Sequence, residues 1–311
     1  MAFAPATGAG WRPLRCIGNF RADRGFQFLG LGLGLAFALA LDLDLTFILE
    51  LLALGAGVGF LAGMLGVGGG MLMVPILTLL FNQRGVESGL AVKMAIATAM
   101  ATIFFTSLSS VRAHHRLGAV RWNIVHRMAP GIAVGGLLGG AGAFAVLKGQ
   151  GLALLFAVFI GYTALKMLRN TPTKHGRAMP GFLGQTAVGT GIGFASALLG
   201  AGGAFLSVPF MTWCNVPPRH AVGTSAALGL PIALASTVGY VVSGWTLPAA
   251  LPSAFGYLYL PALVVVAAAS MTLAPWGART AQRIDVALLK RLFAVLLLVL
   301  AASMLYRAFA G

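Results

Sequence analysis

The feature of this sequence that most constrains its fold is an apolar segment that occurs twice, 134 residues apart. Residues 57–77 read GVGFLAGMLGVGGGMLMVPIL, and residues 191–211 read GIGFASALLGAGGAFLSVPFM, so the two copies align without a gap. Ten of the 21 positions are identical, including the pairs Gly66/Gly200, Gly68/Gly202, Gly69/Gly203 and Pro75/Pro209. Each copy predicts an apolar helix, a glycine break and a second, shorter helix. A Gly/Pro-interrupted hydrophobic segment at corresponding places in two halves of a chain is typical of a transporter's binding site.

Composition places these segments in a membrane. Of the 311 residues, 59% are hydrophobic and 9% are charged, and the mean hydropathy is +0.93, which indicates an all-α polytopic membrane protein. The net charge of +15 does not indicate a nucleic-acid partner, because 17 of the 21 Lys and Arg gather in or beside short segments between apolar runs (12–24, 112–127, 166–177, 219 and 279–291). This distribution is typical of cytoplasmic loops. The two Cys and five His match no metal-binding spacing, so neither a metal nor a cofactor is expected.

After residue 44 the apolar runs form two sets of five. The first set is 45–66, 70–81, 91–111, 128–147 and 151–168, and the second is 182–199, 203–214, 221–243, 255–274 and 292–309. Most runs are long enough, at about 20 residues, to cross the hydrocarbon core, but the second run of each set, at about 12, is not. Each set therefore predicts a glycine-broken pair followed by three transmembrane helices. The pair is either a re-entrant hairpin or two tightly packed crossings, and the lengths favour the hairpin.

The loop charges predict that the two sets are inverted repeats. Loop 112–127 carries four Arg and loop 148–150 a single Lys, whereas loop 244–254 is uncharged and segment 275–291 carries three Arg and one Lys. Under the positive-inside rule, run 221–243 then crosses outward while its counterpart 91–111 crosses inward. This topology requires the pair 45–81 to begin and end outside, and the pair 182–214 to begin and end inside.

The expected organisation is an N-terminal extension (1–44), a first membrane repeat (45–168) and a second membrane repeat (182–309). The extension has a basic start, an apolar stretch at 26–41, and the sequence Ala38-Leu39-Ala40, which has the form of a signal-peptidase site. A cleaved signal, a retained anchor and an extension outside the working protein all remain open.

The glycine clusters are the predicted substrate-binding residues: Gly66, Gly68, Gly69 and Gly70 in the first copy, and Gly200, Gly202 and Gly203 in the second. Glycine lets the backbone leave helical geometry, and the N–H groups at the start of the following helix then favour an anion. We expect the prolines to fall early in the short helices, where a missing N–H costs little. The cluster is not a dinucleotide fingerprint, because its flanks are apolar helices. The alternative is close helix packing, which we expect for Gly135, Gly136, Gly139 and Gly140.

The helix after each break supplies further candidates. Thr224 and Ser225 lie early in the second repeat's helix, and Lys93 and Thr98 lie in the matching region of the first. Lys93 is predicted either to face the anion or to extend to the outer surface. We expect Glu50 to be wetted near the outer face. Arg219 and His220 are expected to cap the helix that they begin.

These residues resemble the sulfite exporter TauE/SafE family of anion transporters. The resemblance covers about residues 45–309 and rests on the doubled Gly-x-Gly-Phe…Leu-Gly-x-Gly-Gly…Val-Pro motif, the Ala-Val-Gly-Thr-Ser sequence from Ala221, and the basic segment from His114 to Trp122. It implies export or uptake of sulfite, a sulfonate or another small organic acid across the bacterial inner membrane. The first repeat departs from the Gly-Thr-Ser pattern with Lys93-Met94-Ala95, so the two half-sites are expected to be chemically unequal.

The leading prediction is therefore a secondary transporter, most simply an exporter, whose partners are a small anion and the lipid bilayer. Proton coupling, facilitated diffusion and a homodimer all remain open. A membrane enzyme is disfavoured, since the apolar runs contain neither a nucleophile–base pair nor a metal site. A scaffold or assembly factor is the remaining alternative, and it would leave the doubled glycine break without a purpose.

Overall fold

The computed structural model describes residues 44–65, 69–169, 176, 178–247, 251, 253–280 and 286–310, and these are helical almost throughout. The first half contains α2 (Leu45–Leu65), α3 (Gly70–Gln83), α4 (Ser88–Arg116), α5 (Trp122–Leu137), the π-helix η1 (Leu138–Ala143), α6 (Phe144–Val146) and α7 (Gly149–Leu168). The second half contains α8 (Phe182–Leu199), α9 (Ala204–Trp213), α10 (Pro218–Gly244), α11 (Leu260–Thr280) and α12 (Val286–Ala310). The predicted all-α polytopic class is confirmed. A two-stranded ribbon, β1 (Ala254–Phe255) and β2 (Leu258–Tyr259), precedes α11 and was not predicted.

The first glycine-broken pair folds as a helical hairpin. The Arg84 Nη1 atom, just after α3, lies 2.6 Å from the Asp44 Oδ2 atom, just before α2, so both ends of the hairpin are on one side of the protein. The 14 residues of α3 extend only about 21 Å, which is less than the hydrocarbon thickness. The predicted hairpin with a short second arm is therefore what the structure contains.

The second pair has the same arrangement. The N–H of Gly176, before α8, donates to the Trp213 carbonyl at the end of α9, at 3.5 Å. The expectation about the prolines was wrong in both hairpins. Pro75 and Pro209 are each the sixth residue of their helix, beyond the first four positions whose N–H groups have no intrahelical acceptor. Each proline therefore removes one helical hydrogen bond inside the short arm.

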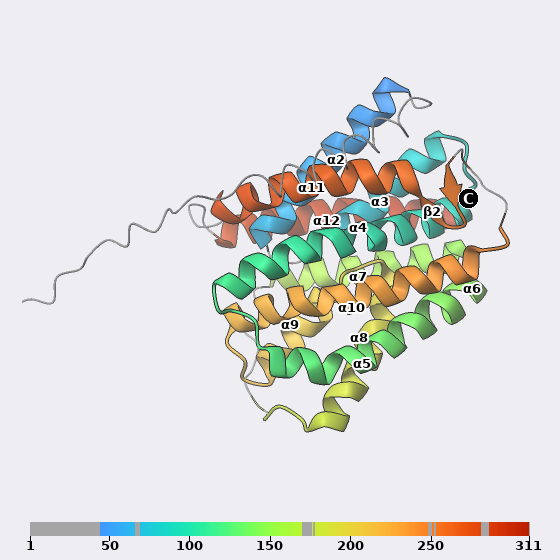
Figure 1. Cartoon of the computed structure of the whole chain (residues 1–311). Helices are drawn as coiled ribbons and strands as arrows, with labels where there is room; N and C mark the ends of the chain where they lie inside the picture. The colour runs from blue at the N-terminus through green and yellow to red at the C-terminus, as the bar shows by residue number, and fades with distance from the viewer. Residues whose placement is uncertain are drawn as a thin grey trace, which may run out of the picture.

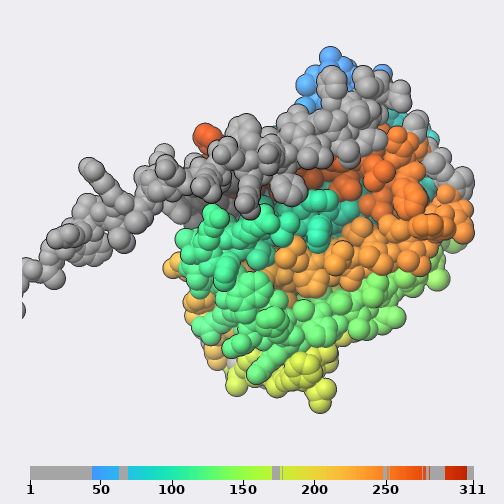
Figure 2. Space-filling model, in the orientation of Figure 1, coloured from blue at the N-terminus to red at the C-terminus, as the bar shows by residue number. Residues whose placement is uncertain are grey.

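Helices from the two halves pair across the molecule (Figure 1). The long arm α2 packs along α11, and the long arm α8 packs along α5, so each hairpin leans on a helix of the other half. Between these pairs α4 packs against α10, and α7 packs against α12. In the space-filling view, α4, α10 and α5 form adjacent bands across one face (Figure 2). The contacts made by α2, α4 and α7 are thus repeated by α8, α10 and α12.

Glycines allow the closest of these contacts. A Cβ atom at Gly139 would lie 2.8 Å from the Ala197 Cβ, and one at Gly140 would lie 2.8 Å from the Ser236 carbonyl oxygen. Gly135 and Gly136 likewise face the backbone of Thr190 and the side chain of Ala235. The expectation that these four glycines serve helix packing is confirmed, because a side chain at any of them would push neighbouring helices apart.

Six of the described helices are long and apolar enough to cross a membrane, namely α2, α4, α5 with η1 and α6, α7, α8 and α10. Their outward surfaces carry exposed leucine, valine and phenylalanine side chains, whereas the interior is a continuous apolar core. Glu50 lies exposed on α2, and its contact with water near the outer face stays a prediction. The apolar exterior is the surface that lipid would cover.

Candidate functional site

The two glycine breaks lie against each other in the middle of the helical bundle. A Cβ atom at Gly70 would collide with the Gly200 carbonyl oxygen of the other break. The side chain of Ile103, on α4, lies beside both breaks: its Cδ1 is 2.8 Å from the Cβ position of Gly70, and its Cγ2 is 3.0 Å from that of Gly202. Two segments 134 residues apart are therefore one structural feature. Gly66 and Gly68 lie outside the described residues.

The two breaks differ in backbone conformation. Gly200 has φ +59° and Gly203 has φ +73°, whereas Gly69 has φ −71°. Only glycine adopts the left-handed conformation without strain, so the second break requires its glycines for backbone reasons. At the first break the restriction is steric, because a Cβ at Gly69 would collide with the Val58 Cγ1 atom.

Hydroxyl groups surround the second break. Ser196 on α8 is fully buried, and its Oγ lies 3.3 Å from the position that a Cβ of Gly203 would take. The Oγ atoms of Ser207 on α9 and Ser225 on α10 lie 2.7 Å apart, and both side chains are buried. Ser225 was among the predicted site residues, whereas Ser196 and Ser207 were not. The signal was in the aligned repeats, since the first copy has Ala62 and Met73 at these positions.

Thr98 and Thr224 hold the starts of two helices. The Thr224 Oγ1 accepts a hydrogen bond from the backbone N–H of Arg121, the residue before α5, at 3.0 Å. The Thr98 Oγ1 accepts one from the backbone N–H of Tyr259, the residue before α11, at 3.1 Å. Both threonine side chains are fully buried. Each bond links α4 or α10 to a helix start in the other half, so these hydroxyls are engaged with backbone rather than facing a cavity.

Lys93 lies near the start of α4. Its Nζ donates to the Ala145 carbonyl at 3.2 Å and lies 5.6 Å and 5.4 Å from the ring centroids of Phe144 and Tyr257. Burial raises the pKa of Tyr257, so this ring is neutral beside the ammonium group. Ile103, which contacts both breaks, is ten residues further along α4, or about 15 Å along the helix axis.

A chain of aromatic contacts joins Lys93 to the second hairpin. The Phe144 ring lies 4.5 Å from the Tyr240 ring, and the Tyr240 hydroxyl donates to the Ala197 carbonyl, next to Ser196. Ile96, one turn inward from Lys93, contacts the Cβ position of Gly200. Lys93 thus lies one helical turn from a residue that contacts the second break, and not in the break itself.

The sequence suggested that Arg219 and His220 cap α10, but they do not. Arg219 donates from Nη2 to the Leu117 carbonyl at 3.1 Å, and His220 Nδ1 lies 3.3 Å from the Ala119 carbonyl. Both therefore bind the α4–α5 loop, and α10 begins instead with Pro218 as its first residue. The expectation failed because a helix that starts with proline already lacks one free N–H, while the loop offers unpaired carbonyls nearby.

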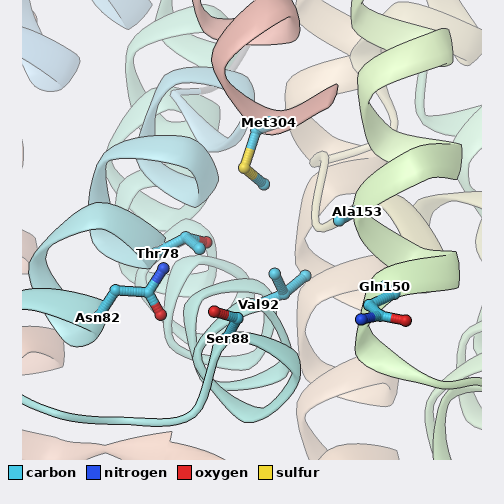
Figure 3. Close-up of a pocket in the computed structure, with 7 residues that line it drawn as sticks. All are labelled: Thr78, Asn82, Ser88, Val92, Gln150, Ala153 and Met304. Carbon is cyan, nitrogen blue, oxygen red and sulfur yellow. The ribbon is translucent and has the colours of Figure 1, made fainter. Parts of the chain in front are cut away.

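A separate pocket lies between the C-terminal end of α3 and the start of α4 (Figure 3). Its empty volume is about 300 Å³, and it is lined by Thr78, Asn82, Ser88, Val92, Gln150, Ala153 and Met304. It contains none of the predicted site residues. Among the residues that the structure describes, no group of three or more His, Cys, Asp and Glu is placed to hold a metal ion.

The profile described as Sulfite exporter TauE/SafE matches residues 51–304. The chain belongs to this family. A probable membrane transporter protein of Haemophilus influenzae is 34% identical over 263 residues, which cover 83% of this chain and 98% of the relative. A probable membrane transporter protein of Methanocaldococcus jannaschii is 24% identical over 76% of this chain and 86% of its own length. No solved structure matches significantly. Family membership and the apolar helices identify a multi-pass membrane protein of a transporter family.

Proposed function

We propose that this protein is a secondary transporter, working as an exporter, that moves a small anion such as sulfite, a sulfonate or another small organic acid across the bacterial inner membrane. The observation that carries the proposal is the contact between the two glycine breaks, where the backbone of Gly70 meets that of Gly200 in the interior of the bundle. Two short helices, α3 and α9, begin at this contact. A helix start offers unpaired N–H groups and the positive end of the helix dipole, which together favour an anion.

The paired contacts of the two halves support alternating access by inverted repeats. Each hairpin packs on a helix of the opposite half, α2 on α11 and α8 on α5. A movement of one such pair relative to the other would open the breaks to one side of the membrane at a time. The first repeat (45–168) and the second (182–309) are the proposed units. One carboxylate, Glu50, lies in their apolar runs, and it is exposed, so coupling through a buried carboxylate is disfavoured.

Flux into proteoliposomes tests this function. The purified protein would be reconstituted, and uptake of sulfite, thiosulfate, taurine, sulfoacetate and acetate measured against protein-free liposomes. Gly203→Leu should abolish flux, because Leu is strained at φ +73° and would collide with Ile232. The matched control is Gly191→Leu at an exposed position on α8, where an added Cβ atom meets nothing within 4 Å. A scaffold or assembly factor would show no flux with any of the five solutes.

A further inference from the structure

We infer that, if the transport function proposed above holds, the anion is bound at the start of α9 by neutral donors alone, with Ser196 and Ser207 among its ligands. We infer further that this site selects monoanions over dianions. Neither serine is part of the glycine motif. The inference rests on the described residues around the second break and on the contrast with the first break.

Ser196 is the observation that points to a ligand. Its side chain is fully buried, and its Oγ has no hydrogen-bond partner among the residues that the structure describes. Leaving a buried hydroxyl unpaired costs about 1–3 kcal/mol, so an unpaired serine in a packed helix needs an explanation. The Oγ lies 3.3 Å from the Cβ position of Gly203 and is therefore directed at the residue that precedes α9.

The start of α9 supplies further donors at the same place. The first intrahelical hydrogen bonds are those of the Leu206 and Ser207 N–H groups to the Gly203 carbonyl. The N–H groups of Ala204 and Phe205 come earlier in the helix and have no acceptor within it. The Ser207 hydroxyl shares one hydrogen bond with Ser225, at 2.7 Å, and each hydroxyl has a single proton to donate. One of the two hydroxyl protons of Ser207 and Ser225 therefore remains free to donate to a third group. The helix has ten residues, enough to give its first turn a favourable dipole.

Among the residues that the structure describes, the first break offers no comparable set of hydroxyls. The position that matches Ser196 is Ala62, and the position that matches Ser207 is Met73. The Cβ position of Gly69 is occupied by the Val58 side chain, and Met73 is buried in the apolar core. The described residues of the first hairpin therefore present an apolar surface, without hydroxyl groups at the matching positions, to the second hairpin. The geometry favours one anion site formed by the second break and closed by the first, rather than two equivalent half-sites.

Charge selectivity follows from the neighbours of this site. The side chains nearest to the Cβ positions of the second break are Val74, Ile96, Ile103, Ile232 and Ser196, none of which is charged. The cost of moving an ion out of water rises with the square of its charge, whereas its stabilisation by fixed neutral dipoles rises only in proportion to the charge. A dianion thus costs about four times as much as a monoanion of similar size to desolvate and gains about twice as much from the donors.

Two sulfur oxyanions of similar shape test the inference. Methanesulfonate and sulfate are both tetrahedral at sulfur but carry one and two negative charges. In proteoliposomes we expect methanesulfonate to show an apparent KM at least about tenfold lower than sulfate, which corresponds to about 1.4 kcal/mol. Ser196→Ala should raise the KM for methanesulfonate about 5–10-fold. It should not lower the thermal stability of the purified protein, because the hydroxyl has no protein partner to lose.

Ser270→Ala is the matched control. Ser270 is also fully buried, but its hydroxyl donates to the Ala267 carbonyl of its own helix, so its loss should leave the KM unchanged. If the wild type transports anions but Ser196→Ala behaves like Ser270→Ala, or sulfate is transported as well as methanesulfonate, this inference is wrong and the transport function stands. If the wild type moves none of the anions tested, both are wrong.

Discussion

Replacing Thr98 with valine should loosen the contact between α4 and the start of α11. Valine has nearly the shape of threonine, so the packing of this fully buried side chain changes little. What is lost is the acceptor for the Tyr259 N–H, which now stands at 3.1 Å from the Thr98 Oγ1 in a buried hydrogen bond. A buried N–H left without a partner costs about 1–3 kcal/mol.

The tertiary context argues for the upper half of that range. Tyr259 is itself buried, and its ring packs against Phe47 and Phe81 at centroid distances of 6.1 Å and 5.6 Å. These contacts join β2 to the first hairpin, so the Tyr259 backbone has little freedom to turn toward water. We therefore expect about 2–3 kcal/mol of destabilisation, or a fall in the melting temperature of several degrees.

The assay is thermal unfolding of the purified protein in detergent, with Thr102→Val as the control. Thr102 lies one turn along the same helix and is also fully buried, but its hydroxyl donates to the Thr98 carbonyl, which retains its helical backbone partner. Thr102→Val should therefore cost less than about 1 kcal/mol. Equal melting temperatures for the two variants would refute the view that the Thr98 hydroxyl holds the start of α11.

Two further predictions concern topology and charge. In single-cysteine labelling of intact cells, Ser253→Cys should react from outside, whereas Ala178→Cys and Thr280→Cys should react only from inside; labelling of Ser253 and Thr280 from one face would contradict the inverted repeats. Because Lys93 binds the Ala145 carbonyl and lies outside the breaks, Lys93→Ala should change the apparent affinity by less than about twofold, and less than Ser225→Ala does. A loss of affinity tenfold greater than that of Ser225→Ala would instead mean that the ammonium group reaches the anion.

Much of the helical framework could be predicted from local sequence. The run 182–199 matches α8 residue for residue, and the other boundaries differ by up to six residues, because hydropathy and glycine act over one or two helical turns. The hairpins were also predictable, since a short apolar arm after a glycine break cannot cross the membrane alone. The ribbon before α11 was missed, as it depends on the register of two two-residue strands.

The candidate site was less predictable than the framework. The doubled motif pointed to the breaks, and the structure brings Gly70 and Gly200 together. In the structure Lys93 lies away from the breaks and binds the Ala145 carbonyl. The hydroxyls of Thr98 and Thr224 accept hydrogen bonds from backbone N–H groups. Each of these partners is more than 50 residues away in the sequence, so no local pattern could have indicated it.

The sequence by itself determined that the protein lies in a membrane, which segments are helices and where those helices break. These properties follow from composition and from the backbone freedom of glycine. The tertiary structure decided which side of each helix meets which neighbour. It gave the second break a buried, unpaired Ser196 and closed the first with Val58. The physical reason is that a hydroxyl becomes a ligand only where packing removes water and every other partner, and packing is set by contacts between distant segments.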